Sequence, residues 1–206
     1  MESRRTAQRS RKSAAERREE IVVAAAQLAL DEGLEQVKLN TVAKRIDVRH
    51  GLINYYFPTV EDLVTTAFIR AISEERGRLF RSGASPLERI RHFVAHVQSP
   101  EAFPSARLWL NARHLSRFTE RLREVLEEQE SLDREQLRLL IDDGMVEGVF
   151  DVRDPVSASV QILIAVDGYG AYANNSGNFT DPAYTNFVPN IVEWTLGLGR
   201  GALAPA

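Results

Sequence analysis

Apolar residues recur every three to four positions along nearly the whole chain, and no convincing stretch alternates between apolar and polar residues. A period near 3.6 residues is typical of amphipathic helices, whereas a half-buried strand has a period of two. Polar breaks and breaks containing glycine or proline divide the pattern into helical segments. The sequence therefore predicts an all-α fold of about nine helices, without an internal repeat.

Several segments carry local signals for the beginning or the end of a helix. Ser13 with Glu16, Thr59, and Ser85 before a proline are typical helix starts, because a hydroxyl can accept a backbone N–H of the first turn. A glycine that follows an apolar stripe is a typical end. We expect helices over 13–33, 39–46, 50–56, 59–79, 85–98, a segment containing Trp109, 119–147, 154–172 and 181–197, with a frayed tail from Gly199.

The segment 38–63 has the pattern of two short helices joined by a tight turn at Asp47 and Val48. The apolar face of the first helix consists of Val42, Ala43 and Ile46. The back of the second helix is also apolar, with Leu52, Ile53, Tyr56 and Phe57. Its front carries hydrogen-bond donors and a flat aromatic ring: Arg49, His50, Asn54 and Tyr55. This arrangement predicts a recognition helix that enters a major groove, with Gly51 allowing close approach to a phosphate.

This stretch resembles the DNA-binding domain of the TetR family of bacterial regulators. The residues that carry the resemblance keep the family's spacing without a gap: Lys38, Val42-Ala43, Ile46-Asp47-Val48-Arg49, Gly51, Ile53-Asn54, Tyr56-Phe57, Thr59-Val60-Glu61 and Leu63. Ala25-Ala26 and Gly33 of the preceding helix also fit, as do the chain length and the number of helices. The resemblance is specific over 21–63 and concerns only the architecture beyond it.

The resemblance implies a homodimer that reads a palindromic DNA operator and binds a small-molecule effector in a larger helical domain. It divides the chain into a basic flexible arm over 1–12, a helix-turn-helix domain over 13–58, and an effector-binding and dimerisation domain over 59–200. The candidate DNA-contacting residues are Lys38, Thr41, Arg49, His50, Gly51, Asn54, Tyr55 and Tyr56, with Arg9, Arg11 and Lys12 of the arm.

Four positions depart from the family's pattern. Lys38 stands where the family usually has a Thr or Ser cap, and Asp47 replaces the turn glycine, so that a left-handed backbone would carry a small strain there. Asn54 and Val60 replace a Tyr and a Lys that commonly touch phosphate in the family, and lost phosphate contacts weaken sequence-independent affinity. Arg49 could pair with guanine and Asn54 with adenine, whereas the neighbouring His50 and Tyr55 could take phosphates.

The charge is unevenly distributed, although the net charge of the whole chain is only −3. Residues 1–18 carry seven basic and two acidic side chains, a net charge of +5, and the rest of the chain therefore carries −8. A basic end on an acidic body predicts a local anionic partner, and arginines before the first helix can lie in a minor groove. A solvated, disordered tail is the alternative interpretation.

Other classes of function find little support in the sequence. The chain has no cysteine, which excludes disulfides and thiolate zinc sites and fits a cytoplasmic protein. No apolar run is long enough to span a membrane, and no signal-peptide core follows the basic N-terminus. Common catalytic and cofactor-binding motifs are missing, so we expect neither an enzyme nor a cofactor. His92 and His96 have the spacing of a metal pair, but without a third ligand we expect a solvated helix face.

The predicted helix over 154–172 is unusually apolar and rich in small residues, as expected for a helix buried on more than one side. We expect it to form, with the last helix, a four-helix bundle across a two-fold axis. The candidate effector-binding residues are Trp109, Asn111, Phe118, Asp167 and Tyr172, for each of which core packing or an internal hydrogen bond is the alternative. If Asp167 is buried, it needs either a buried donor or a cationic ligand.

These features together predict a DNA-binding transcriptional regulator, specifically a repressor that a small-molecule ligand releases from its operator. One alternative is a regulator that works without a ligand and has a vestigial pocket. Another is a small all-α binding protein or enzyme that merely retains the helix-turn-helix. An apolar interior filled by protein side chains would favour the ligand-independent alternative.

Overall fold

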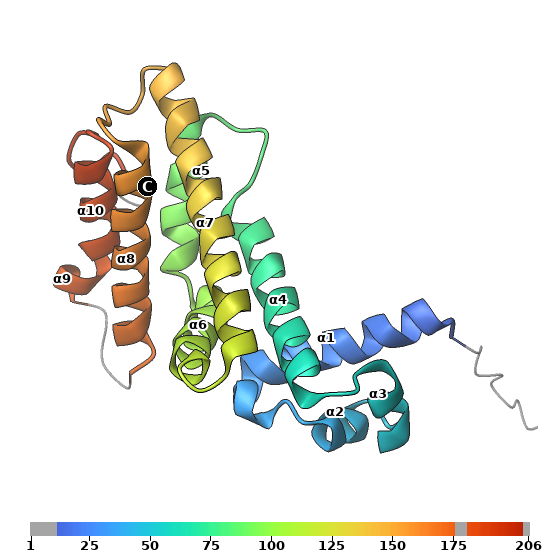
Figure 1. The fold of residues 1–206 in the computed structure, drawn as a ribbon. Coiled ribbons are helices and arrows are strands. Elements are labelled where there is room, and N and C mark those ends of the chain that lie inside the picture. The colour runs from blue at the N-terminus through green and yellow to red at the C-terminus, as the bar shows by residue number, and fades with distance from the viewer. Residues whose placement is uncertain (1–11, 176–180, 204–206) are drawn as a thin grey trace, which may run out of the picture.

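The computed structural model describes residues 12–175 and 181–203 (Figure 1). Within these ranges the chain is helical and has no strand, which confirms the all-α prediction. The α-helices are α1 (Ala14–Glu32), α2 (Leu39–Arg45), α3 (His50–Tyr56), α4 (Val60–Leu79), α5 (Pro86–Val97), α6 (Phe103–Ser116), α7 (Glu120–Val146), α8 (Pro155–Ala173), α9 (Pro182–Thr185) and α10 (Phe187–Thr195). Two short 3-10 helices, η1 (Leu34–Gln36) and η2 (Pro100–Ala102), connect them. None of the described helices is apolar over a length that could cross a membrane.

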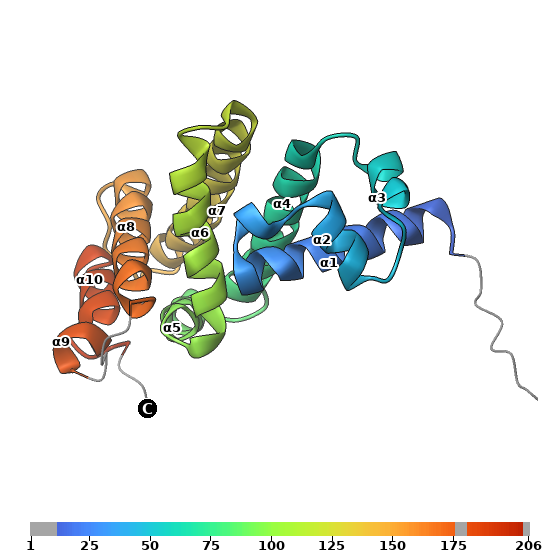
Figure 2. The same cartoon turned by 90° about the horizontal axis from the view of Figure 1, so that it is seen from below.

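The helices form a small lobe and a larger bundle (Figures 1 and 2). The lobe contains α1, α2 and α3, and α4 leads from it into the bundle of the remaining helices. In the bundle, α8 lies against α7 on one side and against α10 on the other. The lobe and the bundle are joined by the packing of α1 along α4 and of α6 against α1 and η1.

Two clusters of buried apolar side chains support this arrangement. The first cluster fills the lobe and continues through α4 to Leu108 and Ala112 of α6 and Leu122 of α7. The second cluster fills the bundle between α5, α7, α8 and α10. Because α7 contributes to both clusters, the apolar core of the lobe continues into the bundle.

The predicted helix starts are confirmed by their hydrogen bonds. The Ser13 hydroxyl accepts the Glu16 N–H at 3.2 Å, and the Glu16 carboxylate accepts the Ser13 N–H at 2.7 Å. Ser85 and Glu88 form the same reciprocal pair at the start of α5. The Thr59 hydroxyl accepts the Asp62 N–H at 3.1 Å. Each of these side chains satisfies a backbone donor that the first turn of a helix leaves free.

The last predicted helix, 181–197, is divided in two, which the sequence analysis did not expect. Asn186 separates the single turn of α9 from α10. Pro189 has no N–H to donate to the Thr185 carbonyl four residues earlier. The Gln98 side chain donates to that carbonyl instead, at 2.6 Å. A side chain of another segment thus replaces the bond that a continuous helix would have made.

The frayed tail expected from Gly199 is also wrong for the described residues up to Leu203. The Glu193 side chain of α10 is buried, and its carboxylate accepts the N–H groups of Gly201 at 2.9 Å and Leu203 at 2.8 Å. The Arg91 guanidinium donates to the Ala202 carbonyl at 3.0 Å. Leu203 is buried in the second cluster. The tail therefore folds back because a buried carboxylate binds its backbone.

Gly144 in the last turn of α7 should tolerate no side chain. A Cβ atom added there would lie 2.0 Å from the Phe150 ring, which is buried. We expect Gly144→Ala to lower the free energy of unfolding by about 1–3 kcal/mol, because the ring has to move out of its packed position. Gly77→Ala in α4 is the matched control, since its added Cβ meets no atom within 4 Å. The control should be neutral or raise stability by up to about 1 kcal/mol through helix propensity. Urea unfolding of both variants checks the pair, and equal effects would contradict the packing described.

Candidate DNA-reading face and effector cavity

The helix pair α2 and α3 is positioned by the core of the lobe. Val42 and Ala43 of α2 and Ile53 and Phe57 at the back of α3 are buried in the first cluster. The Arg18 guanidinium of α1 lies 5.0 Å from the centre of the Phe57 ring, which adds a cation–π contact to this anchor. The back of α3 is thus held from two sides, and its front is left free.

The turn between α2 and α3 adopts the left-handed backbone that the sequence analysis foresaw. Asp47 has a φ of 52°, the only positive φ of a non-glycine residue in the described chain. Asp tolerates this region better than most residues, so the strain is small. Lys38 precedes α2 without a side-chain hydrogen bond to it, as its replacement of a Thr or Ser cap predicts.

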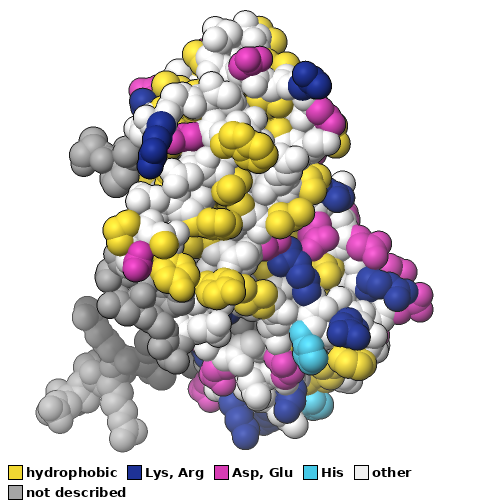
Figure 3. Space-filling view, turned by 90° about the vertical axis from the view of Figure 1, so that its left-hand side faces the viewer, with side chains coloured by type: hydrophobic (Ala, Val, Ile, Leu, Met, Phe, Trp, Pro, Cys, Tyr) yellow, Lys and Arg dark blue, Asp and Glu magenta, His cyan; other side chains and the backbone are white. Residues whose placement is uncertain are grey.

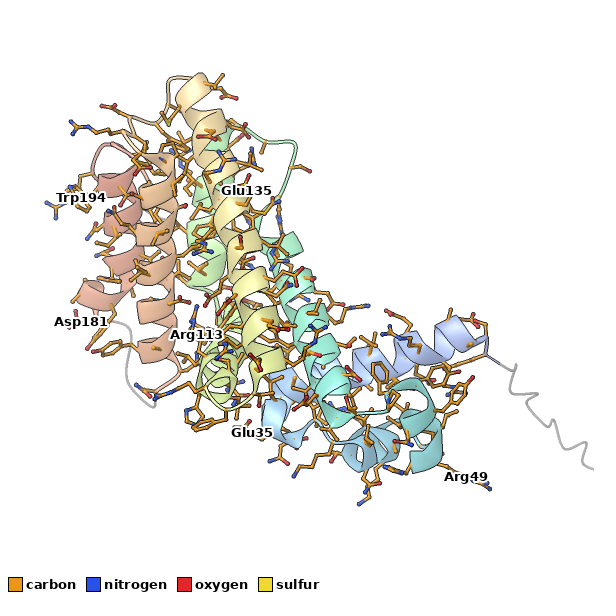
Figure 4. All side chains as sticks on the ribbon, in the orientation of Figure 1. Glu35, Arg49, Arg113, Glu135, Asp181 and Trp194 are labelled. Atoms are coloured by element: carbon orange, nitrogen blue, oxygen red, sulfur yellow. The ribbon has the colours of Figure 1, made fainter. Side chains whose placement is uncertain are left out.

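The front of α3 is exposed, as the pattern predicted. Arg49, His50, Gly51, Asn54 and Tyr55 are all exposed, with 77% of Tyr55 accessible. Tyr56 is half-buried against the core, and its ring meets that of Tyr55 edge-on at 5.1 Å. In Figure 4, Arg49 points away from the molecule at the outer end of the lobe. On α2 and just before it, Thr41 is half-buried and Lys38 is exposed.

The basic residues of this face differ in whether they are free to meet an anion. Within the described chain, Lys38, Lys44 and Arg49 form no ion pair, whereas Arg45 donates to Asp31 at 2.6 Å. Of the predicted arm, Arg9 and Arg11 lie outside the described residues. Lys12 is described, and its ammonium binds Glu20 at 2.6 Å. The free positive charges of this face, among its described residues, therefore lie on α2 or just before it and at the start of α3.

A cavity of about 280 Å³ lies within the bundle, between α4, α5, α6, α7 and α8. Most of its wall is apolar: Leu79, Phe80, Phe93, Val97, Ala102, Ala106, Trp109, Leu110, Val160, Leu163, Ile164 and Val166. Its polar part carries Glu75, Arg113, Glu130, Asp133, Arg134 and Asp167. An apolar wall with a few convergent polar groups is typical of small-molecule sites, and the volume is at the small end of their range.

Arg113 is at the centre of the polar part, between α7 and α8 (Figure 4). Its guanidinium donates to Asp167 at 2.7 Å and to Glu130 at 3.0 Å, and it lies 5.4 Å from the centre of the Trp109 ring. Asp167 is half-buried and has a half-buried donor in Arg113, which is one of the two kinds of partner expected for it from the sequence. Burial raises the pKa of Asp167 even though Arg113 opposes that shift.

The structure brings two of the five predicted effector residues, Trp109 and Asp167, into this cavity. Phe118 and Tyr172 are 76% and 60% exposed and do not line it. Phe118 follows α6, where only the His114 ring lies beside it, and Tyr172 faces outward near Tyr184. The helical pattern marks apolar positions without showing which of them face a cavity.

Asn111 also lies outside the cavity and connects the bundle to the lobe. Its side-chain oxygen accepts the Leu34 N–H at 2.7 Å, and its nitrogen donates to the Glu35 carboxylate at 2.8 Å. Leu34 and Glu35 belong to η1, directly after α1. Asn111 is thus a polar link between α6 and the DNA-reading lobe, which no pattern along the sequence indicated.

His92 and His96 make separate hydrogen bonds. The Nε2 atom of His92 lies 2.7 Å from the Arg78 carbonyl oxygen, and that of His96 lies 2.8 Å from the Glu75 carboxylate. The expectation of a solvated face is wrong for His96, whose side chain is only 12% exposed. No group of three potential metal ligands occurs among the described residues.

The outer face of α8 and α10 is apolar and exposed (Figure 3). It is the side on which these two helices lie in Figure 1, and Trp194 points outward from it in Figure 4. Its exposed apolar residues include Val156, Ile164, Tyr172, Phe187 and Trp194. Contiguous apolar surface of this kind marks interaction sites on proteins.

Several residues of the polar part of the cavity were not predicted from the sequence. Arg113, Glu130 and Asp133 line the cavity, and Arg76 pairs with Asp133 from α4. The acidic residues of α7 look like an exposed charged helix face in the sequence. The one signal in the sequence was Asp167 within an apolar helix. It indicated that a partner must exist but not that the partner is Arg113.

Comparisons with known proteins agree with this geometry. Residues 21–67 match the family model of the bacterial regulatory proteins of the tetR family. A search of curated proteins found no match.

Solved structures resemble nearly the whole chain. A TetR-family transcriptional regulator from Rhodococcus sp. is 21% identical over 88% of this chain and 99% of its own, with a TM-score of 0.75. A transcriptional regulator from Saccharomonospora viridis, solved in complex with choline, is 19% identical over 87% of this chain and 96% of its own, with a TM-score of 0.72. The fatty acid degradation regulator FadR from Bacillus halodurans is 20% identical over 93% of this chain and 99% of its own, with a TM-score of 0.66.

At these identities the solved structures show only a shared fold. The family match concerns the helix-turn-helix lobe and the start of α4. The fold is one that supports DNA-binding regulation. Residues 21–67 therefore carry the DNA-binding region of the tetR family of bacterial regulatory proteins, and the chain as a whole shares the fold of solved structures that include a TetR-family regulator.

Proposed function

We propose that this protein is a homodimeric transcriptional repressor that leaves a palindromic operator when a small molecule occupies the cavity between α4 and α8. The front of α3 carries the proposal. Arg49, directly before α3, and Asn54 and Tyr55 on it are exposed together, and the back of this helix is fixed in the core. Such a surface can read base edges, while the free Lys38 and Lys44 are suited to phosphates. Arg9 and Arg11 would add minor-groove contacts.

Dimerisation through α8 and α10 would place two such lobes on one DNA duplex. The exposed apolar face of these helices supports this, because two copies related by a two-fold axis can cover each other's face. Two recognition helices one helical turn of DNA apart would then read the two halves of a palindrome. A protein of this kind works in the cytoplasm, where the chromosome lies.

Ligand control is supported by the cavity and by its connection to the lobe through α6. Trp109 and Arg113 of α6 line the cavity, and Asn111 of the same helix bonds to η1. A ligand that shifts α6 would therefore shift the lobe and change the separation of the two reading heads. DNA affinity falls if the ligand prefers the separation that does not fit the operator. An unfilled cavity favours this mechanism over a ligand-independent regulator.

Arg49→Ala should reduce sequence preference more than general DNA affinity. We expect a loss of about 1–3 kcal/mol on a selected operator and little change on scrambled DNA, because a bidentate base contact specifies sequence. Gel shifts with an operator obtained by genomic selection measure both. Arg121→Ala is the control, since Arg121 is exposed on α7 and pairs only with Glu124. If the wild type bound no selected sequence above background, the repressor proposal would fail.

Trp194→Arg should convert the dimer to a monomer. The Trp194 side chain is 75% exposed in the single chain, and burying a charge there without a partner is costly in a dimer. Val146→Arg is the control, because Val146 is 89% exposed and lies at the end of α7 rather than on α8 or α10. Light scattering after size-exclusion chromatography measures the mass. A dimer that survives Trp194→Arg would place the interface elsewhere.

Asn111→Ala should loosen the connection between bundle and lobe without unfolding either. The Leu34 N–H loses its acceptor and should exchange faster with deuterium, and DNA affinity should fall severalfold because the reading heads are less firmly spaced. Hydrogen exchange with mass spectrometry and gel shifts measure the two effects. Gln27→Ala, which removes one exposed side-chain bond to Asp31 within α1, is the control. Unchanged exchange and DNA affinity would show that Asn111 is not the link.

A further inference from the structure

The polar part of the cavity contains more carboxylates than cations to pair with them. Arg113 is shared by Asp167 and Glu130, at 2.7 and 3.0 Å. Asp133 pairs with Arg76, which also donates to the Gln129 side chain at 3.0 Å. Three carboxylates on α7 and α8 are therefore held by two guanidinium groups.

The two other charged groups of the cavity wall do not remove this excess. Glu75 is occupied by His96 at 2.8 Å and by Arg78 at 3.0 Å. Arg134 is exposed and forms no ion pair within the described chain, so solvent screens its charge. The negative excess is thus confined to the group formed by Glu130, Asp133 and Asp167.

Each of these carboxylates has an oxygen left to accept a hydrogen bond. Asp167 uses Oδ2 with Arg113, Glu130 uses Oε1 with Arg113, and Asp133 uses Oδ1 with Arg76. The second oxygen of each has no donor among the described residues, and none of the three is fully shielded from solvent. Acceptors in this arrangement favour a ligand that donates hydrogen bonds and carries positive charge.

Burial makes the excess negative charge of this group unfavourable. Desolvation raises the pKa of Asp133 to about 6 although Arg76 acts in the opposite direction, and Asp167 and Glu130 add to the rise. The side chain of Asp133 is only 12% exposed. A positive group entering the cavity would stabilise the ionised carboxylates, whereas a second anion would add to their repulsion.

The remainder of the cavity fits an apolar body. The ring centres of Phe80 and Phe93 lie 5.6 Å apart on one wall. The Trp109 ring packs edge-on against Phe68, with 5.3 Å between their ring centres. Aromatic walls close to a polar part can hold both the ring of a ligand and a neighbouring cation.

We propose that the effector of this cavity is a small amphipathic amine, whose ammonium binds Asp167, Glu130 and Asp133 and whose apolar body lies along Phe80, Phe93 and Trp109. The inference rests on the proposed ligand-binding role of the cavity and adds the chemical class of the ligand. An anionic amphiphile, bound to Arg113 and Arg134, is the opposite outcome of the test.

Three probes of similar shape and different charge test the ligand class on the full-length dimer. Phenethylamine, 2-phenylethanol and phenylacetate are compared by isothermal titration calorimetry at neutral pH. We expect the amine to bind at least about tenfold more tightly than the alcohol, and phenylacetate to bind most weakly. Equal affinities, tighter binding of phenylacetate, or no binding of any probe would each overturn the proposal. DNA gel shifts are independent of these results, so a failure here is distinguishable from a failure of the DNA-binding function.

Two variants test whether the carboxylates of Asp167 and Glu130 bind the ammonium group of the ligand. Asp167→Asn and Glu130→Gln should each weaken phenethylamine about tenfold and leave 2-phenylethanol within about twofold, because only the ammonium depends on a carboxylate. Glu135→Gln is the matched control on α7: Glu135 is exposed, pairs with Arg138 at 2.6 Å and lies outside the cavity. Circular dichroism checks the folding of each variant, and Glu130→Gln carries the test if Asp167→Asn unfolds. An effect of Glu135→Gln equal to theirs would overturn the assignment.

Affinity for the amine should also depend on pH. Asp133 takes up a proton as the pH falls through about 6, and the neutral acid no longer attracts an ammonium group. Binding should therefore weaken severalfold between pH 7.5 and pH 5.5, while the alcohol is unaffected. The charged and titratable groups around Asp133 are Glu75, Arg76, His96, Arg113, Glu130, Arg134 and Asp167. Asp133→Asn removes this titrating carboxyl, and an unchanged pH profile in this variant would contradict the role of Asp133.

Discussion

The packing of α1 along α4 is the contact on which both ends of the molecule depend. Ile21, Ala25 and Leu28 of α1 and Leu63, Ala67 and Phe68 of α4 are buried in one cluster. That cluster fixes α2 and α3 from behind and extends to α6 and α7. A three-helix lobe of this size buries too little apolar surface to be stable alone, so it shares a core with the bundle. The DNA-reading face is consequently rigid with respect to α4, and a displacement of α4 or α6 must reach it.

The charges of the cavity, of which Arg76 and Asp133 are nearly buried and Arg113 and Asp167 half-buried, are not explained by the stability of the core. An apolar interior of the same shape would be at least as stable, because desolvating ions costs more than a pair usually returns. Arg76, Arg113, Asp133 and Asp167 are therefore better explained by binding than by stability. Their arrangement leaves acceptors unpaired and raises the pKa of Asp133 to about 6, a state that a positively charged ligand can improve.

Local features of the fold could be predicted from the sequence, and features that join distant segments could not. Helix starts could be predicted at Ser13, Thr59 and Ser85, because a capping side chain binds a backbone group only three residues away. The turn at Asp47 follows from the spacing of the apolar residues on both sides of it. The division at Asn186 depends on Gln98, which is far away in the sequence, and the folded tail depends on the burial of Glu193.

The cavity shows the same limit. Asp167 was recognisable because a carboxylate within an apolar helix needs a partner, and Trp109 because a large aromatic ring lies on a helix near the expected pocket. Arg113 and Asp133 were not recognisable, since each lies on a helix rich in polar residues and only the packing of α6, α7 and α8 turns them inward. Asn111 could not be assigned either, because its partners lie in η1, some 77 residues earlier in the chain.

The geometry of α6 explains how one helix can connect two sites. Trp109 and Arg113 are four residues apart and therefore share a face, whereas Asn111 lies between them and is rotated by about 200° from Trp109. The first face lines the cavity, and the second bonds to the lobe at η1. A ligand that competes for Asp167 and Glu130 changes the partners of Arg113, and α6 can respond by a shift or rotation. Because the link at Asn111 consists of two short hydrogen bonds to backbone and carboxylate, such a movement has to be followed by η1 and by α1, on which α3 is mounted. If the lobe follows as one body with its core, a change in the pairing of a single guanidinium would alter the spacing of the two reading heads in the proposed dimer.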